Sequence, residues 1–248
     1  MIPIARAAAP AILTTKFIQE GVDRFKADGH SVWDVSSIKS ALLDMSSSKC
    51  AYCELRLGEG AAYLEVEHFF AKKHHPDKVL DWDNLLPACK RCNGSKGSWD
   101  TAAPGQMMVD PCLMNPQKHI HLDLAYRPVG ITKEGENTVI EVGLNDIHRL
   151  GVMRYAIGET FKDKLEELCQ EHLAIVTGAP TRQRRALVRR LKVLMDQCAS
   201  DQPFSAVLST VLIRSSHYEI LQNSIMVWGD WDAQLDASDR SARALSLA

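Results

Sequence analysis

Two Cys-x-x-Cys pairs constrain this chain more than any other feature. Cys50 and Cys53 form the first pair, and Cys89 and Cys92 form the second. Each pair presents two sulfurs from one tight turn, and four thiolates complete the tetrahedral shell of Zn²⁺. The pairs therefore predict a structural zinc site. Such a site is closed, so its zinc would hold the fold together and do no chemistry.

The cysteine count supports this interpretation. The chain has seven cysteines, an odd number, and only four of them lie in tight pairs. That distribution fits a metal site in a reducing compartment better than a disulfide framework. The isolated Cys112, Cys169 and Cys198 are expected to be ordinary small core residues.

Composition limits the classes of protein that remain. The chain has 248 residues, 46% of them hydrophobic and 24% charged, as in an ordinary globular protein. Its net charge of −2 excludes a globally basic nucleic-acid binder. Contact with phosphate must therefore come from local basic patches or from a bound metal ion.

No segment has the pattern of a membrane or export sequence. Pro3 and Pro10 interrupt the N-terminal stretch, and no continuous signal core follows. A membrane span needs about 18 consecutive apolar residues, and the chain has no such run. We expect a cytoplasmic protein with no membrane partner.

Between and around the cysteine pairs, the pattern predicts strand, loop, strand and helix. Residues 63–68 alternate apolar and polar side chains, which predicts a strand. We expect the returning segment over residues 82–86 and the first turn of a helix over residues 93–96. Two amphipathic helices are expected before them, over 14–29, where Gly29 ends the pattern, and over 35–45.

The second half of the chain is predicted to be mostly helical. The prolines in 100–118 indicate a linker or irregular segment, and alternation in 119–124 and 137–142 predicts a small antiparallel hairpin. Helical spacing then covers 146–176, as one helix or two, 181–198 and 205–225.

Four polar residues indicate a second site of a different kind. They are Glu67, His68, Asn84 and Asn93, which offer hard oxygen ligands and a proton acceptor suited to Mg²⁺ and phosphate. Taken singly, each has a plainer explanation: a solvated strand end, an Asx turn or a helix N-cap. Their order, bracketed by the cysteine pairs, favours a site.

These motifs resemble the HNH endonuclease family. Glu67-His68, the segment Asn84-Leu-Leu-Pro, and Cys92-Asn93-x-x-Lys96 match its successive motifs, with Asn93 where many members have His. The resemblance implies an α+β protein: a ββα-metal core with a four-cysteine zinc site, embedded in helices. It also implies hydrolysis of phosphodiester bonds in nucleic acid, expected to be double-stranded DNA, with Mg²⁺ or Mn²⁺ as the catalytic ion.

The same resemblance implies roles for individual residues. His68 would be the general base that activates water, and Glu67 and Asn93 would hold the divalent ion. Asn84 would hold the His68 ring or its loop through a hydrogen bond. In a regular strand Glu67 and His68 point to opposite faces, so the strand must bend or end there.

Further motifs narrow the resemblance to one subgroup. Val-Glu-His-Phe at 66–69, Asp-Trp-x-Asn at 81–84 and Gly-Leu-Asn at 143–145 are similar to the HNH nucleases of Septu and retron-associated anti-phage systems. That resemblance implies control by an ABC-type or SMC-like ATPase. The chain has no Gly-x-x-x-x-Gly-Lys loop of its own, so nucleotide dependence must come from a partner.

Two basic groups are expected to contact nucleic acid. Lys72, Lys73 and Lys96 would border the substrate groove, although a solvated loop has the same composition. Arg182, Arg185 and Arg189 form one stripe of a helix that could bind phosphates or an acidic partner. Equally, that stripe could be a solvated face paired with acidic residues of the preceding helix.

These patterns predict three regions: a helical segment over 1–49, a nuclease core over 50–100, and a hairpin with helices over 101–248 that binds a partner or substrate. An alternative function remains open. The chain could be a zinc-stapled module that binds nucleic acid or protein and has an inactive HNH site.

Overall fold

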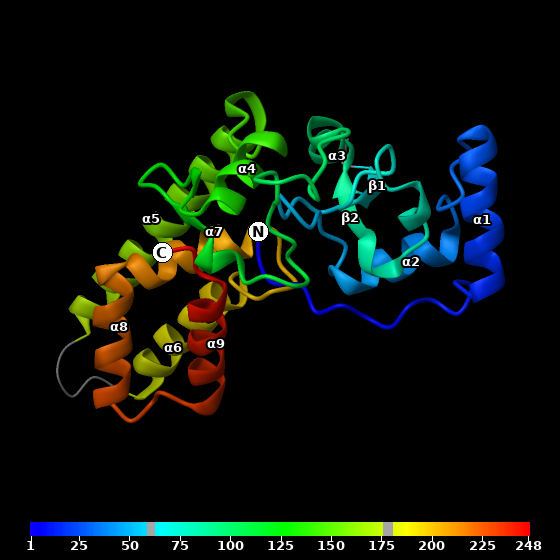
Figure 1. Ribbon diagram of the computed structural model, residues 1–248. Helices are drawn as coiled ribbons and strands as arrows, with labels where there is room; N and C mark the ends of the chain where they lie inside the picture. The colour runs from blue at the N-terminus through cyan, green and yellow to red at the C-terminus, as the bar shows by residue number, and fades with distance from the viewer. Residues whose placement is uncertain (59–62, 176–180) are drawn as a thin grey trace. The chain divides into compact units, whose positions relative to one another are not determined.

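The computed structural model describes residues 1–58, 63–175 and 181–248 (Figure 1). Contacts divide the chain into two compact units, each described here by itself. The first unit comprises Met1–Ile120 and Pro128–Asp146, and the second comprises His121–Arg127 and Ile147–Ala248. Over these described residues the fold consists of helices and two small sheets, so the predicted α+β class is confirmed.

The first unit contains four α-helices and three 3₁₀ turns among its described residues. Its helices are α1 (Thr15–Asp28), α2 (Ser36–Met45), α3 (Lys90–Lys96) and α4 (Lys133–Glu141), and its 3₁₀ turns are η1 (Pro76–Lys78), η2 (Trp82–Asn84) and η3 (Pro116–Lys118). Helix α1 begins and ends where the sequence predicts. The Thr14 side chain caps its first turn, and Gly29 ends it in the left-handed conformation that glycine favours.

The central structure is an antiparallel pair of strands followed by a helix. Strand β1 (Leu64–His68) pairs with β2 (Leu85–Cys89), and α3 starts at the next residue, as Figure 1 shows. The returning strand lies later than the predicted 82–86, because Asp81 accepts a hydrogen bond from the Asp83 amide and caps the 3₁₀ turn η2 there. The predicted order of strand, loop, strand and helix is otherwise confirmed.

One hydrophobic core joins the N-terminal helices to this ββα unit. Val22 of α1 and Ile38 and Leu42 of α2 belong to the same buried cluster as Val66 of β1 and Leu85 of β2. Alternation along β1 places Val66 on this side and its neighbours Glu65 and Glu67 on the other. The helices therefore cover one face of the strand pair and leave the opposite face to α3.

The predicted strand over 137–142 is wrong. Residues 137–141 belong to α4 and Val142 is its C-cap, and the partner of β3 (Ile120–Leu122) in the second sheet is β4 (Pro128–Gly130). The Thr132 side chain accepts a hydrogen bond from the Gly135 amide and caps α4. A side chain at Gly135 would collide with the His119 carbonyl, since a Cβ there would lie 1.9 Å from that oxygen.

The second unit is mainly helical, and the sequence analysis missed the break at Ser215 between two of its helices. It contains the π-helical turn η4 (Ile147–Gly151), α5 (Val152–Ala174), α6 (Thr181–Asp196), α7 (Ser205–Arg214), α8 (Ser216–Val227) and α9 (Ala233–Leu245). The predicted helix over 205–225 is two helices, because Ser215 is extended and its side chain caps α8. Helix α9 was not predicted, and Val176 of the expected 146–176 helix lies outside the described residues. Among the described helices, none is both long and apolar enough to span a bilayer.

Candidate functional site

The four paired cysteines converge into one cluster. The sulfurs of Cys50, Cys53, Cys89 and Cys92 all lie within 4.8 Å of one another, and each residue is at most 1% exposed. Cys53 Sγ and Cys89 Sγ are 3.8 Å apart. With Zn–S bonds of about 2.3 Å, tetrahedral thiolates lie roughly 3.8 Å apart, so the cluster fits a zinc ion.

Local backbone geometry builds both halves of this cluster. In the first half the Glu54 amide donates to the Cys50 carbonyl, and Glu54 has a positive φ of 63° that closes the turn. The Ala51 amide donates to the Pro87 carbonyl and fastens this turn to β2. The second half lies at the junction where Cys89 ends β2 and Cys92 follows in the first turn of α3.

Electrostatics also favour a cation among the four sulfurs. Hydrogen bonds from the neighbouring Cys50, Cys53 and Cys92 thiols lower the pKa of Cys89. Several thiolates in one buried cluster repel one another unless a positive ion is shared among them. The predicted zinc ligands are therefore together and chemically suited to that ion.

A separate, open cavity contains the other predicted site residues. Its volume is about 280 Å³. It is lined by Glu67, His68, Ala71, Lys72, Lys73, Asn93, Gly97 and Ser98. Strand β1 ends at His68 and the chain turns at Phe69, which lets Glu67 and His68 line one cavity although neighbouring strand residues point to opposite faces.

Glu67 is buried and paired with a buried lysine. Lys96 Nζ lies 2.7 Å from Glu67 Oε1 and 2.8 Å from the His68 carbonyl oxygen, and the Lys96 side chain is 0% exposed. Lys96 was predicted to contact nucleic acid, and that prediction is wrong because its ammonium is used inside the protein. Burial raises the pKa of Glu67, and Lys96 opposes the shift.

Glu67 still has one carboxylate oxygen for another ligand. Tyr52 Oη donates to the same Oε1 that Lys96 contacts, at 3.4 Å. Within the described chain, Glu67 Oε2 receives no hydrogen bond. A hard divalent ion prefers such an oxygen, so Glu67 can supply one ligand to the cavity.

The His68 ring is held as a neutral base. Its Nε2 lies 3.1 Å from the Val79 carbonyl oxygen, which can only accept, so Nε2 carries the proton and Nδ1 keeps a free lone pair. Burial lowers the pKa of His68 to about 4. The Trp33 ring packs edge-on against the imidazole, with centroids 4.5 Å apart. His68 is therefore uncharged and oriented at neutral pH.

Asn84 holds the loop between the strands and does not bind the His68 ring. Its Oδ1 accepts from the Phe70 amide at 2.6 Å, and its Nδ2 donates to the carbonyls of Phe70 and Lys78 at 3.2 and 3.0 Å. Of the two predicted roles, the structure supports the loop. The ring is instead held by Val79, which lies next to Lys78 in that loop.

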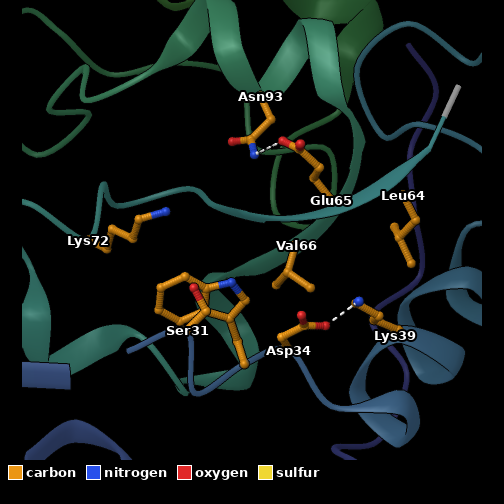
Figure 2. A pocket seen from close by; sticks show the side chains of 9 residues that line it. Ser31, Asp34, Lys39, Leu64, Glu65, Val66, Lys72 and Asn93 are labelled. Carbon is orange, nitrogen blue, oxygen red and sulfur yellow. Dashed lines mark hydrogen bonds and ion pairs between the residues drawn. The ribbon is translucent and has the colours of Figure 1, made fainter. Parts of the chain in front are cut away.

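Asn93 pairs with an acid that the sequence analysis did not single out. Its Nδ2 donates to Glu65 Oε2 at 2.6 Å, and Figure 2 draws this hydrogen bond as a dashed line. Glu67 and Asn93 line the same cavity but share no hydrogen bond in the described chain. Strict alternation was the available signal, because it places Glu65 and Glu67 on the same face of β1.

Arg6 is a second residue whose role the sequence analysis missed. Its guanidinium donates to the carbonyls of Trp82, Asp83 and Leu85, at 3.0, 3.1 and 2.6 Å. These carbonyls flank Asn84 in the chain. Arg6 therefore fixes the turn that carries Asn84, and it joins residues so distant in sequence that no local pattern predicts the contact.

The other basic residues that were predicted to contact nucleic acid are accessible. Lys72 and Lys73 are exposed at the open cavity, and Lys72 Nζ lies 4.7 Å from the centre of the Trp33 ring. Arg182, Arg185 and Arg189 are exposed on α6 of the second unit. The preceding helix does supply one acidic partner to α6, but Glu171 pairs with Arg190, outside that stripe.

Comparison with known proteins identifies the family. Residues 50–98 match the HNH endonuclease family. This segment contains both the cysteine cluster and the predicted residues of the open cavity. Septu protein PtuB of Bacillus thuringiensis is 33% identical, over 94% of this chain and 90% of the relative. Septu protein PtuB of Bacillus mycoides (strain KBAB4) is 27% identical, over 56% of this chain and 61% of the relative. The chain belongs to the Septu PtuB family and is an HNH endonuclease.

Proposed function

We propose that this protein cleaves double-stranded DNA as the effector nuclease of an anti-phage defence complex. The observation that carries the proposal is the open cavity shared by Glu67, His68 and Asn93, beside a closed cysteine cluster. Membership of the PtuB family supports the role in defence. DNA as substrate and an ATPase as partner go beyond the family and are the parts to be tested.

Nucleophile activation is assigned to His68. Its Nδ1 takes a proton from the water that attacks the scissile phosphorus, while Nε2–H keeps its hydrogen bond to the Val79 carbonyl. That carbonyl also stabilises the imidazolium formed in this step. Hydrolysis leaves a 5′ phosphate and a 3′ hydroxyl.

Glu67 Oε2 and Asn93 Oδ1 would hold the divalent ion, because both oxygens lack a hydrogen-bond partner in the described chain and both residues line the cavity. Mg²⁺ or Mn²⁺, when bound, neutralises the phosphate and stabilises the leaving oxygen. Lys96 opposes the rise in the pKa of Glu67 and holds its carboxylate in place. Asn84 and Arg6 hold the loop and turn around the cavity.

Exposed basic residues would position the backbone of the nucleic acid. Lys72 and Lys73 border the cavity and can contact phosphates beside the scissile bond. Arg182, Arg185 and Arg189 supply a second basic surface on α6, which we also assign to contacts with phosphates of the nucleic acid.

Cleavage of supercoiled plasmid with Mg²⁺ or Mn²⁺ tests the activity, with a single-stranded RNA of matched length as the competing substrate. We expect DNA to be cut by wild type and not by His68→Ala, while exposed His30→Ala cuts like wild type. Nicking by His68→Ala at close to the wild-type rate would remove His68 from the mechanism. Preferential cleavage of RNA would overturn the substrate.

Co-purification from the native operon tests the partner. We expect an ATPase to travel with the chain and cleavage by the complex to depend on ATP. If neither the chain nor the complex cuts any nucleic acid, the protein is instead a binding module with an inactive site.

A further inference from the structure

We infer that Glu65 is a positioning residue: it binds the amide nitrogen of Asn93 and so turns the amide oxygen toward the open cavity. This inference rests on the proposed function, because it concerns how Asn93 comes to present a ligand for the divalent ion. Neither the motifs nor the family match assigns a role to Glu65.

Two parallel contacts connect β1 to α3. Glu65 and Glu67 lie two residues apart on one face of the strand, and Asn93 and Lys96 lie three apart on the helix. Glu65 contacts Asn93 at 2.6 Å, and Glu67 contacts Lys96 at 2.7 Å. The second contact is an ion pair, but the first joins an acid to a neutral amide, so charge neutralisation does not explain it.

Asn93 lines two cavities. It lines one, of about 240 Å³, together with Glu65, Trp33 and Lys72. It lines the other, the open cavity, together with Glu67 and His68. Figure 2 shows the amide nitrogen turned toward Glu65 and the amide oxygen turned away from it.

The chemistry of the pair determines that orientation. The two ends of an asparagine amide are nearly equal in size, but one only donates and the other only accepts hydrogen bonds. An ionised carboxylate only accepts, so Glu65 can bind Nδ2 and would repel Oδ1 at the same distance. Hard cations bind the amide oxygen and not the nitrogen. Glu65 therefore selects the one rotamer of Asn93 that can serve as a ligand.

Glutamine at position 65 separates this role from simple packing. Glu65→Gln keeps the shape of the side chain, but its own amide can either accept from or donate to Asn93. The orientation of Asn93 is then no longer fixed. Loss of residues that orient a ligand typically weakens metal binding by about 10- to 100-fold, and we expect a loss in that range.

Aspartate at position 93 should remove or reverse the effect. Both ends of that carboxylate are oxygens, so no orientation needs to be selected, and Glu65 now repels it. In the Asn93→Asp background, Glu65→Gln should therefore leave the affinity for the divalent ion unchanged or raise it. A loss of affinity that occurs only when residue 93 is Asn is the signature of orientation.

Calorimetric titration of Mn²⁺ into the zinc-loaded full chain measures this directly, without relying on activity. The proteins are wild type, Glu65→Gln, Asn93→Asp, the double variant and Asn93→Ala, each with its zinc content and melting temperature measured. Weaker binding with Glu65→Gln only when residue 93 is Asn supports the inference. If Glu65→Gln weakens Mn²⁺ binding equally with Asn93 and with Asp at position 93, the inference is overturned and Glu65 is a direct ligand. If Glu65→Gln weakens Mn²⁺ binding in neither case, the inference is overturned as well.

Asn93→Ala distinguishes the two levels of the account. If it abolishes Mn²⁺ binding while Glu65→Gln changes nothing, the proposed metal site stands and only the role of Glu65 fails. If Asn93→Ala leaves Mn²⁺ affinity unchanged, the proposed site fails, and the role of Glu65 fails with it.

Discussion

The cysteine cluster and the open cavity lie on either side of one junction and have opposite designs. Cys89 and Cys92 at the β2–α3 junction cluster with two other sulfurs, whereas Asn93, the next residue, binds an acid and lines an open cavity. The four sulfur ligands form a closed site. The pairs Glu65–Asn93 and Glu67–Lys96 instead leave one oxygen of Asn93 and one of Glu67 without a hydrogen bond in the described chain. A single short segment can thus stabilise the fold and present a reactive site.

Removing a zinc ligand should have the largest effect. Zinc binding contributes on the order of 10 kcal/mol to the folding of small zinc modules, so Cys89→Ser should lose zinc and much of the stability of the first unit. Cys112→Ser, at an isolated and partly exposed cysteine, is the matched control. Metal analysis and thermal unfolding measure both. A full equivalent of zinc in Cys89→Ser would contradict the cluster.

Breaking the Glu67–Lys96 pair should have the next largest effect. Lys96→Met keeps the length of the side chain but leaves Glu67 buried without its cation, which costs about 3–5 kcal/mol in comparable pairs. The double variant Glu67→Gln/Lys96→Met should recover most of that loss, since no charge remains buried. Denaturant unfolding tests this. Equal stability of Lys96→Met and wild type would show that the pair is not formed in solution.

Removing the hydrogen bonds that hold the loop between β1 and β2 should lower the stability by a smaller amount. Asn84→Ala removes three hydrogen bonds to the backbone of Phe70 and Lys78, each worth roughly 1 kcal/mol. We therefore expect a loss of about 2–3 kcal/mol in the free energy of unfolding and faster hydrogen exchange around residues 70–78. Unchanged exchange in that loop would argue against Asn84 as its anchor.

Removing an exposed lysine should weaken nucleic-acid binding but hardly change the stability of the protein. Lys72→Ala should change the free energy of unfolding by at most about 0.5 kcal/mol, in contrast to buried Lys96→Met. It should weaken DNA binding and reduce the slope of log affinity against log salt by about one. Titration at several salt concentrations measures this. A slope equal to that of wild type would remove Lys72 from the phosphate contacts.

The sequence was most informative where spacing is dictated by chemistry. The cysteine pairs require one geometry for a metal, and the alternation from Leu64 to His68 requires a strand, so both could be predicted. Alternation at 137–142 misled, because the cap at Thr132 and the close approach of Gly135 to His119 stabilise a helix there. Local periodicity does not report such contacts.

Within the site, the residue types could be predicted but their pairing could not. Lys96 carries a charge that is usually solvated, and only the fold reveals that Glu67 buries it. Arg6 binds a turn about 80 residues away in the chain, as the contact with the Leu85 carbonyl illustrates. Contacts of this kind depend on tertiary packing and leave no periodic signal.

The central claim is that the two sites do separate work, with zinc for structure and His68 for chemistry. The most direct test is the Mg²⁺-dependent rate of plasmid cleavage by His68→Ala protein that retains a full equivalent of zinc. If His68 is the general base, this rate is reduced by about 10²- to 10⁴-fold at unchanged zinc content. Cleavage near the wild-type rate would contradict that role.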